Sequence, residues 1–244
     1  YLGATSGEVK INGFDIFAQP EEAKKCVGYL PEIPPLYVDM TVREYLNFVA
    51  ELKKLEKGRR NKYVEEAMVT TGITAQQSRL IRNLSKGYRQ RVGFAQAVLG
   101  YPEILILDEP TSGLDPGERV RFRNLLSEFA KDRIVVISTH IVSDVEYIAN
   151  QNAIMKDGKI IENDTTEQLV RLVDGKIWEC KIPSSDLVKW ERALKLINLR
   201  NEADGTTSIR YLSDQAETPD SVSAVPRLED LYLWLFPQEG EVRL

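Results

Sequence analysis

Two acidic residues, Asp108 and Glu109, directly follow an apolar run at residues 104–107. A run without polar residues is typical of a parallel strand buried in an α/β sheet, and such sheets place their ligands at the carboxyl ends of their strands. One carboxylate at that edge can hold Mg²⁺, and the next can deprotonate a water for attack on a phosphate. The alternative is an acidic turn that only ends a strand.

A second candidate phosphate site begins at Ser85, which precedes a helical pattern over residues 86–99. Gly87 lies in the first turn of that helix, where it permits close approach of a ligand. The free backbone N–H groups and the dipole of a helix N-terminus favour a phosphate. A serine in this position also caps a helix without any further function, and this interpretation stays open.

Asp115 follows the predicted strand that ends at the acidic pair, and His140 follows the next predicted strand. Asp115 precedes Pro116, and Glu118 is the third residue of the predicted helix. This is a well-formed helix start, so capping alone explains Asp115. His140, the single histidine, comes after an apolar run at residues 134–138. It should therefore emerge at the same sheet edge as the acidic pair, as a hydrogen-bond donor to phosphate or as a structural residue.

The elements that must position these residues follow an α/β alternation. Apolar runs predict strands at residues 27–30, 104–107 and 134–138, and amphipathic patterns predict helices at 86–99 and 116–130. Continuous hydrophobicity predicts strands covered by helices on both faces. The fold class expected is therefore α/β, with a mostly parallel sheet covered by helices.

Smaller elements flank this sheet. Asn12-Gly13 and Asp157-Gly158 predict antiparallel hairpins, and Thr41 with Glu44 has the spacing of a capping box that opens a helical insert over about residues 41–100. After residue 169 the pattern changes to a small α+β module. Its expected elements are strands at 177–182 and 208–212, a helix at 187–199, a linker or loop at 216–226 and a short amphipathic end at 228–236.

Composition narrows the class of protein. The chain has 244 residues with 43% hydrophobic and 28% charged residues, which is typical of a soluble globular protein, and no apolar run approaches the length of a membrane span. The net charge of −5 argues against a nucleic-acid-coating role, so we expect no nucleic acid partner. Cys26 and Cys180 lie far apart without a CxxC pair, which fits buried thiols in a reducing compartment.

Taken in order, these segments resemble the motifs of ABC transporter ATP-binding subunits. Residues 84–91 resemble the signature motif, 104–110 the Walker B strand, 112–116 the D-loop and 138–140 the switch histidine. The resemblance covers about residues 1–165. Two further segments are similar to the exporter-type branch of that family. They are residues 27–32 with the prolines and Tyr37 after them, and the Leu-Glu-Asp-Leu-Tyr run at 228–232.

The resemblance implies a P-loop NTPase-like fold and a head-to-tail dimer that binds ATP and Mg²⁺ between two subunits. Asp108 would hold Mg²⁺, Glu109 would be the general base and His140 would contact the γ-phosphate. In the same comparison, the residues that would bind the partner's nucleotide or bridge the dimer are Ser85, Lys86, Gly87 and Asp115. The implied protein is an ATPase at the cytoplasmic face of the cell membrane that powers transport through a permease.

Two departures from the family pattern stand out. Position 32 is Glu where most of the family has Gln; Glu32 can still ligate Mg²⁺, but it would add negative charge beside the phosphates. The sequence also contains no G-K-[ST], the part of a P-loop that cradles the β- and γ-phosphates. We therefore expect a fragment of a competent parent, with an ATPase domain at residues 1–169 that lacks its P-loop and an accessory module at 170–244.

Two other functions remain open. A soluble ABC ATPase of the translation or DNA-repair type usually carries a second cassette or a long coiled-coil insertion, and neither is evident here. A non-catalytic regulatory binding module would use the same motifs only as a scaffold. Ile33, Leu36, Tyr37 and Met40 could form an apolar surface for a permease, or could pack within their own subdomain.

Overall fold

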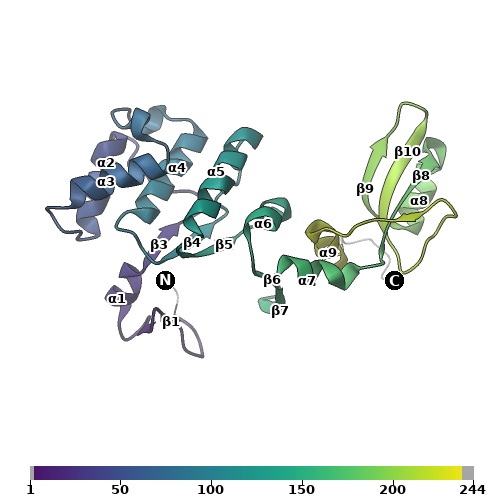
Figure 1. The fold of residues 1–244 in the computed structure, drawn as a ribbon, viewed down its shortest axis with the longest axis horizontal. Helices are drawn as coiled ribbons and strands as arrows, with labels where there is room; N and C mark the ends of the chain where they lie inside the picture. The colour runs from purple at the N-terminus through teal and green to yellow at the C-terminus, as the bar shows by residue number, and fades with distance from the viewer. Residues whose placement is uncertain (1–2, 238–244) are drawn as a thin grey trace. The chain divides into compact units, whose positions relative to one another are not determined.

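The computed structural model describes residues 3–237, which form two compact units, Tyr1–His140 and Ile141–Leu244. Figure 1 labels most of the helices and strands of both units.

A parallel sheet of order β3-β4-β5 forms the centre of the first unit. Its strands are β3 (Val27–Leu30), β4 (Ile104–Asp108) and β5 (Ile134–Ser138), which confirms the three predicted strands. The last residue of β4, Asp108, lies opposite the last residue of β5, Ser138. Because the strands are parallel, the segments that follow them leave the sheet at the same edge.

Two helices cover one face of this sheet (Figure 1). These are α4 (Lys86–Val98) and α5 (Pro116–Phe129), as the sequence predicts to within a residue at their ends. Leu105 and Leu107 of β4 are fully buried on the covered face. The ring of Phe94 on α4 lies 5.3 Å from that of Phe122 on α5, centroid to centroid, so the two helices share one apolar core.

Gly28 allows α4 to lie close to β3. A Cβ atom at this position would collide with the backbone carbonyl of Ala97 on α4. Any larger residue would therefore push α4 away from the sheet, and with it the segment that carries Ser85.

The opposite face of the same sheet is apolar and uncovered by the described residues. Its side chains alternate with the buried ones, and Tyr29, Ile134 and Val136 are 40%, 61% and 50% exposed. The sequence predicts strands covered on both faces, but in the described part of the chain helices cover only one. Burial of these strands therefore follows a period of two, although their hydrophobicity is continuous.

The helical insert precedes α4. It contains α2 (Val42–Leu52), α3 (Arg60–Thr70) and two single 3₁₀ turns, η1 (Thr74–Gln76) and η2 (Ile81–Asn83). The predicted capping box at the start of α2 is confirmed, with Thr41 and Glu44 bonded in both directions.

The N-terminal hairpin is also confirmed. It pairs β1 (Lys10–Ile11) with β2 (Phe14–Asp15) around Asn12 and Gly13, both of which have positive φ. The sequence analysis did not predict α1 (Pro20–Lys25), which follows this hairpin.

The second unit begins with a helix and a hairpin. These are α6 (Val142–Ile148), β6 (Asn152–Lys156) and β7 (Lys159–Asp164), followed by α7 (Thr166–Val170) and η3 (Arg171–Val173). A four-stranded antiparallel sheet of order β11-β8-β10-β9 follows. Its elements are β8 (Ile177–Pro183), η4 (Ser184–Asp186), α8 (Leu187–Ala193), β9 (Lys195–Asn201), β10 (Thr206–Leu212) and β11 (Val222–Ser223), and α9 (Leu228–Leu235) comes last.

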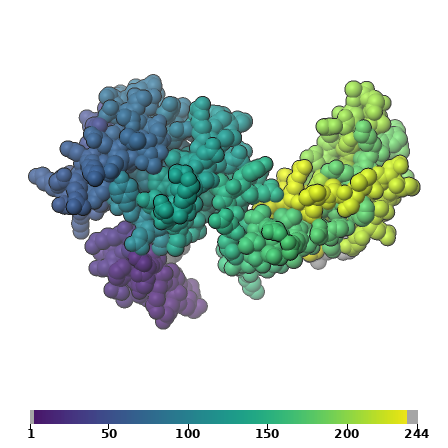
Figure 2. All heavy atoms as spheres, in the orientation of Figure 1, coloured from purple at the N-terminus to yellow at the C-terminus, as the bar shows by residue number. Residues whose placement is uncertain are grey.

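The division at His140 differs from the expected domain boundary after residue 169. Leu169 and Val173 share a buried apolar cluster with Leu228 and Leu231 of α9, and Val142 of α6 packs against it. In Figure 2 the yellow C-terminal atoms accordingly lie on the green atoms of the residues that open this unit. Residues 141–173 therefore pack with the C-terminal module.

One predicted element of this module is wrong in part. The helix expected over residues 187–199 ends as α8 at Ala193, and Lys195–Asn201 form strand β9. Pairing of β9 along β10 supplies backbone hydrogen bonds that override the helical side-chain pattern. No helix among residues 3–237 is long and apolar enough to span a bilayer.

An ion pair buried in the second unit joins α9 to the sheet. Arg210 on β10 donates from Nε and Nη2 to the two carboxylate oxygens of Asp230, at 3.1 and 2.6 Å. The guanidinium also donates to Glu179 and to the carbonyl of Val225. Both Arg210 and Asp230 are buried, so the Asp230 carboxylate depends on the Arg210 guanidinium for compensation of its charge.

We predict that Asp230→Asn lowers the free energy of unfolding of the second unit by about 3 kcal/mol, because it leaves the buried Arg210 guanidinium with the half-exposed Glu179 as its remaining charged partner. All three tryptophans, Trp178, Trp190 and Trp234, lie in this unit. Tryptophan fluorescence during urea unfolding therefore measures its stability directly.

The matched control is Asp214→Asn, which removes an exposed carboxylate paired with Lys176 at 3.0 Å. We expect a change within about 0.5 kcal/mol for this variant. Equal effects of the two substitutions would contradict a special contribution of the buried pair.

Candidate functional site

The site is built where β4 and β5 end side by side. Ser138 lies opposite Asp108 in the sheet register, and its Oγ donates to Asp108 Oδ1 at 2.5 Å. The hydroxyl fixes one carboxylate oxygen of Asp108 and leaves the other for a ligand.

Glu109 continues the pairing for one residue beyond the strand. Its backbone N–H donates to the Ser138 carbonyl at 2.9 Å, and its φ of 45° then turns the chain sharply. Such a left-handed conformation is costly for a residue other than glycine, so the surrounding contacts must maintain it.

Three donors hold the Glu109 carboxylate. The Thr139 hydroxyl donates to Oε2 at 3.0 Å, and the His140 backbone N–H donates to Oε1 at 2.9 Å. His140 Nδ1 lies 2.7 Å from the same Oε1. The Glu109 side chain is only 18% exposed and the His140 side chain is 72% exposed, so the carboxylate is enclosed while the imidazole borders solvent.

A second cluster lies at the N-terminus of α4. Ser85 caps the helix, with its Oγ accepting from the Tyr88 N–H at 3.4 Å. A Cβ atom on Gly87 would come within 3.2 Å of the Glu118 carboxylate, so the first turn of α4 lies close to the first turn of α5.

Lys86 lies across the turn that leads into α5. Its ammonium would collide with a Cβ atom at Gly113, which also has a φ of +64°. Gly113 is thus the residue that allows both the turn and the close approach of the lysine.

Asp115 caps α5, with its Oδ1 accepting from the Glu118 N–H at 2.9 Å. Glu118 in turn binds Arg91 of α4 at 2.9 Å, with both side chains mostly buried. Gln90 of α4 donates to the carbonyl of Pro110 at 3.1 Å, which links this cluster to the segment after Glu109.

The structure thus distributes the predicted site residues over two clusters. Asp108, Glu109 and His140 lie together at the ends of β4 and β5, whereas Ser85, Lys86, Gly87 and Asp115 lie around the starts of α4 and α5. Glu32 is exposed two residues beyond β3, at the same carboxyl edge as the first cluster.

The sequence analysis missed two contributors, Ser138 and Thr139. Their hydroxyls bind the two carboxylates of the acidic pair, Ser138 to Asp108 and Thr139 to Glu109. The available signal was the position of two consecutive hydroxyl residues at the end of the neighbouring predicted strand.

In the described part of the chain, no three His, Cys, Asp or Glu side chains gather into a group that could hold a metal ion. Asp108 with one uncommitted oxygen suits a metal that takes few protein ligands. Mg²⁺ is such a metal, since it is usually bound by one or two carboxylates together with substrate phosphates and water.

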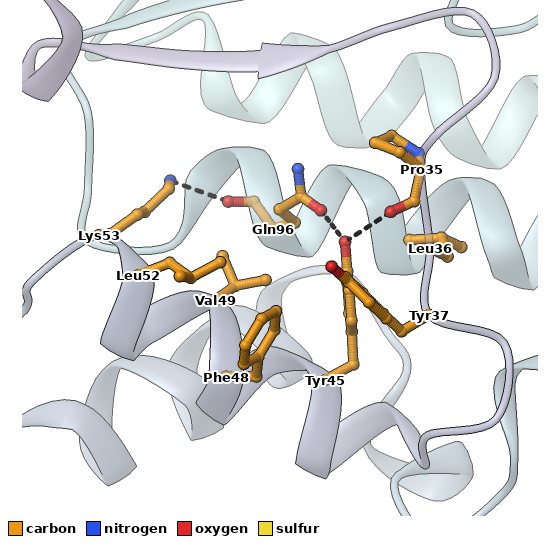
Figure 3. Close-up of a pocket in the computed structure, with 9 residues that line it drawn as sticks. All are labelled: Pro35, Leu36, Tyr37, Tyr45, Phe48, Val49, Leu52, Lys53 and Gln96. Carbon is orange, nitrogen blue, oxygen red and sulfur yellow. Dashed lines mark hydrogen bonds between the residues drawn. The ribbon is translucent and has the colours of Figure 1, made fainter.

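A shallow groove of about 600 Å³ lies beside the helical insert (Figure 3). Its lining is mostly apolar and consists of Pro35, Leu36, Tyr37, Tyr45, Phe48, Val49, Leu52, Lys53 and Gln96. The rings of Tyr37 and Phe48 meet edge to face with centroids 5.2 Å apart. The segment after β3 and helix α2 thus form its two sides.

Polar contacts tie the groove to α4. The Tyr45 hydroxyl bonds to the Gln96 side chain and to the Pro35 carbonyl (Figure 3). Burial, with a smaller contribution from Tyr37, raises the pKa of Tyr45 to about 12. The phenol therefore stays protonated and available as a donor at neutral pH.

Lys53 holds the C-terminal end of α4. Its ammonium donates to the carbonyls of Gln96, Ala97 and Leu99, at 2.9, 3.2 and 2.9 Å. These carbonyls have no partner within the helix, and a cation is favourable at a helix C-terminus. Burial lowers the pKa of Lys53 to about 8.

This fold is that of the ABC-type ATPase domain. A solved structure of cbiO1 from Clostridium perfringens, described as part of the ABC transporter complex cbiONQ, superposes with a TM-score of 0.62 and 27% identity. The superposition covers 70% of this chain and 73% of that one.

The sequence comparisons agree with the fold. The family described as ABC transporter matches residues 2–112, a little under half of this chain. Bacitracin transport ATP-binding protein BcrA of Bacillus licheniformis is 36% identical over 160 residues, which cover 65% of this chain and 51% of the relative. The chain thus spans about half the length of that relative.

A second relative matches the C-terminal module as well. The probable multidrug ABC transporter ATP-binding protein YbhF of Escherichia coli is 26% identical over 253 aligned residues, which cover 98% of this chain and 44% of the relative.

We predict that Lys53→Met lowers the free energy of unfolding of the first unit by about 1–3 kcal/mol at pH 7, because the carbonyls at the end of α4 lose their donor. An exposed lysine in the unfolded chain titrates near 10.4, above the folded value, so between pH 8 and 10 the folded state binds fewer protons. The advantage of the wild type over the variant should therefore grow as pH rises through this window.

Lys57→Met, which removes an exposed lysine from the same insert, is the control and should change stability by less than about 0.5 kcal/mol. Helical circular dichroism during urea unfolding measures both variants. A wild-type advantage that shrinks between pH 8 and 10 would contradict the assignment.

Proposed function

We propose that residues 1–244 are part of an ATP-binding and ATP-hydrolysing subunit of an ABC transporter, which powers export through a membrane permease. The observation that carries this proposal is the enclosed Glu109 carboxylate, held beside Asp108 and His140 at the carboxyl edge of a parallel sheet. This is where an α/β sheet binds its ligand, and the matched relatives are named as transport ATP-binding proteins.

Each residue of the first cluster has a proposed role in MgATP hydrolysis. Asp108 would hold Mg²⁺, and Glu32 is a second carboxylate at this edge. When bound there, Mg²⁺ would supply positive charge that offsets the negative charge of the phosphates. Glu109 accepts a proton from the attacking water, and the exposed His140 imidazole turns toward the γ-phosphate.

The second cluster acts on the nucleotide of another subunit. Ser85, Lys86 and Gly87 present a capped helix N-terminus, a cation and a residue without a side chain, all of which favour a phosphate. We propose that they close the site of the partner in a head-to-tail dimer, and that Asp115 bridges the two subunits.

The phosphate cradle must come from residues outside 1–244, because this sequence contains no G-K-[ST]. The uncovered apolar face with Tyr29, Ile134 and Val136 supports this proposal. An additional strand beside β5 and an apolar helix over that face would complete the sheet and place a phosphate-binding loop next to Asp108.

We further propose that the groove between Tyr37 and α2 binds a short segment of the permease. Its apolar lining and edge-to-face aromatic pair suit an amphipathic helix. The subunit would then lie at the cytoplasmic face of the membrane as a peripheral protein.

The other two functions make different demands on the same residues. A non-catalytic regulatory module would tolerate loss of Glu109, and a soluble non-transport ABC ATPase would hydrolyse ATP without a membrane partner at the groove. Substitution of Glu109 tests the first possibility, and crosslinking from the groove tests the second.

We predict that Glu109→Gln in the intact protein lowers the turnover of MgATP by about 10²–10⁴-fold, because the amide cannot accept the proton of the attacking water. A phosphate-release assay measures this change. Glu103→Gln, at an exposed residue directly before β4, is the matched control and should retain activity. Undiminished hydrolysis in Glu109→Gln would remove Glu109 from the role of base.

We predict that a photoreactive amino acid at position 37 crosslinks to a membrane protein in membranes that contain the assembled transporter. Tyr37 is exposed on the groove, and Val69 on α3 is exposed outside its lining. The same probe at position 69 should give no such product. Absence of a product at position 37, or equal products at both, would count against permease binding in the groove.

A further inference from the structure

The two carboxylates of the site are each held by a hydroxyl from the neighbouring strand. Ser138 is the register partner of Asp108 and donates to it, and Thr139, the residue after β5, donates to Glu109, the residue after β4. Two consecutive hydroxyls thus bind two consecutive carboxylates where the paired strands end.

The donors on Glu109 differ in how firmly they are fixed. The His140 imidazole is largely exposed, so it can turn away and release its contact with Oε1. The Thr139 hydroxyl binds the other oxygen, Oε2, and Thr139 directly follows β5. Because threonine is branched at Cβ, its χ1 angle is restricted and its hydroxyl is held in place.

Glu109 needs such a contact because its own backbone conformation is costly. With a φ of 45°, the segment after β4 keeps this turn only while its neighbours stabilise it. A carboxylate that must accept a proton from water has to be held within a fraction of an ångström of the productive geometry.

We propose that Thr139 is the positioning residue of the reaction, whose hydroxyl keeps the Glu109 carboxylate oriented when the His140 imidazole leaves it for the phosphate. This inference rests on the proposed role of Glu109 as the base. Thr139 acts through Glu109 and takes no proton itself. The backbone N–H of His140 holds Oε1 in the same state.

The test compares Thr139→Val with Thr139→Ser in the intact protein. Valine keeps the shape of threonine without the hydroxyl, and serine keeps the hydroxyl without the methyl group. We expect Thr139→Val to lower kcat for MgATP about 10-fold with KM within about 2-fold of the wild type, and Thr139→Ser to restore kcat to within about 3-fold.

Thr207→Val is the matched control. Thr207 is buried in the second unit, and its hydroxyl donates to the Asn201 side chain at 3.0 Å and bonds to the Ser184 hydroxyl at 2.8 Å, so this variant loses hydroxyl hydrogen bonds away from the site. This variant should leave kcat unchanged. If Thr139→Val does not fold, Thr139→Ala replaces it in the same comparison with Thr139→Ser.

The outcomes separate this inference from the proposed function. A kcat that is unchanged when the hydroxyl is removed, or that falls equally in Thr139→Val and Thr139→Ser, would overturn the role of Thr139. In either case, loss of hydrolysis in Glu109→Gln would still support Glu109 as the base. Undiminished hydrolysis in Glu109→Gln would instead overturn both.

Discussion

The parallel pairing of β4 with β5 is the constraint on which the site depends. It brings Asp108 and Glu109 next to residues about thirty positions further along the chain, so that two acidic side chains share an edge with two hydroxyls and an imidazole. The backbone bond from the Glu109 N–H to the Ser138 carbonyl extends this pairing past the end of the strand. A slip of the register by one residue would exchange the hydroxyl partners and send the side chains to opposite faces.

Helix α4 connects the candidate site of the first unit with the apolar groove beside α2. Its first turn contains the Ser85 cap and approaches α5, and Gln90 reaches the segment after Glu109. Its last turn ends on the Lys53 ammonium beside the groove. Gly28 lets the helix lie directly on β3, so a displacement at either end would be transmitted along one rigid element.

Much of the fold could be predicted from local sequence patterns. The capping box at Thr41, the Asn12-Gly13 hairpin and the apolar strands follow from short-range rules, and the structure confirms them. Strand β9 did not follow from such rules, because its helical side-chain pattern is outweighed by pairing with a distant strand. The unit boundary at His140 depends on packing of α6 and α7 against α9, which sequence spacing does not encode.

The candidate site could also be predicted from the sequence only in part. The acidic pair and His140 stand out by type and by position after apolar runs, whereas the roles of Ser138 and Thr139 depend on the exact register between strands. Serine and threonine are too common at strand ends to indicate a contact by themselves. Only the arrangement of both strands distinguishes them from ordinary turn residues.

The sequence of β5, Ile-Val-Val-Ile-Ser, has a consequence for handling the protein in solution. Among the described residues only one of its edges is paired, and two of its apolar side chains, Ile134 and Val136, are exposed. A short strand that is rich in β-branched residues and has an unpaired edge can pair with the same strand of another molecule. The strand that orders the carboxylates is therefore also the segment from which self-association of residues 1–244 would start as their concentration rises.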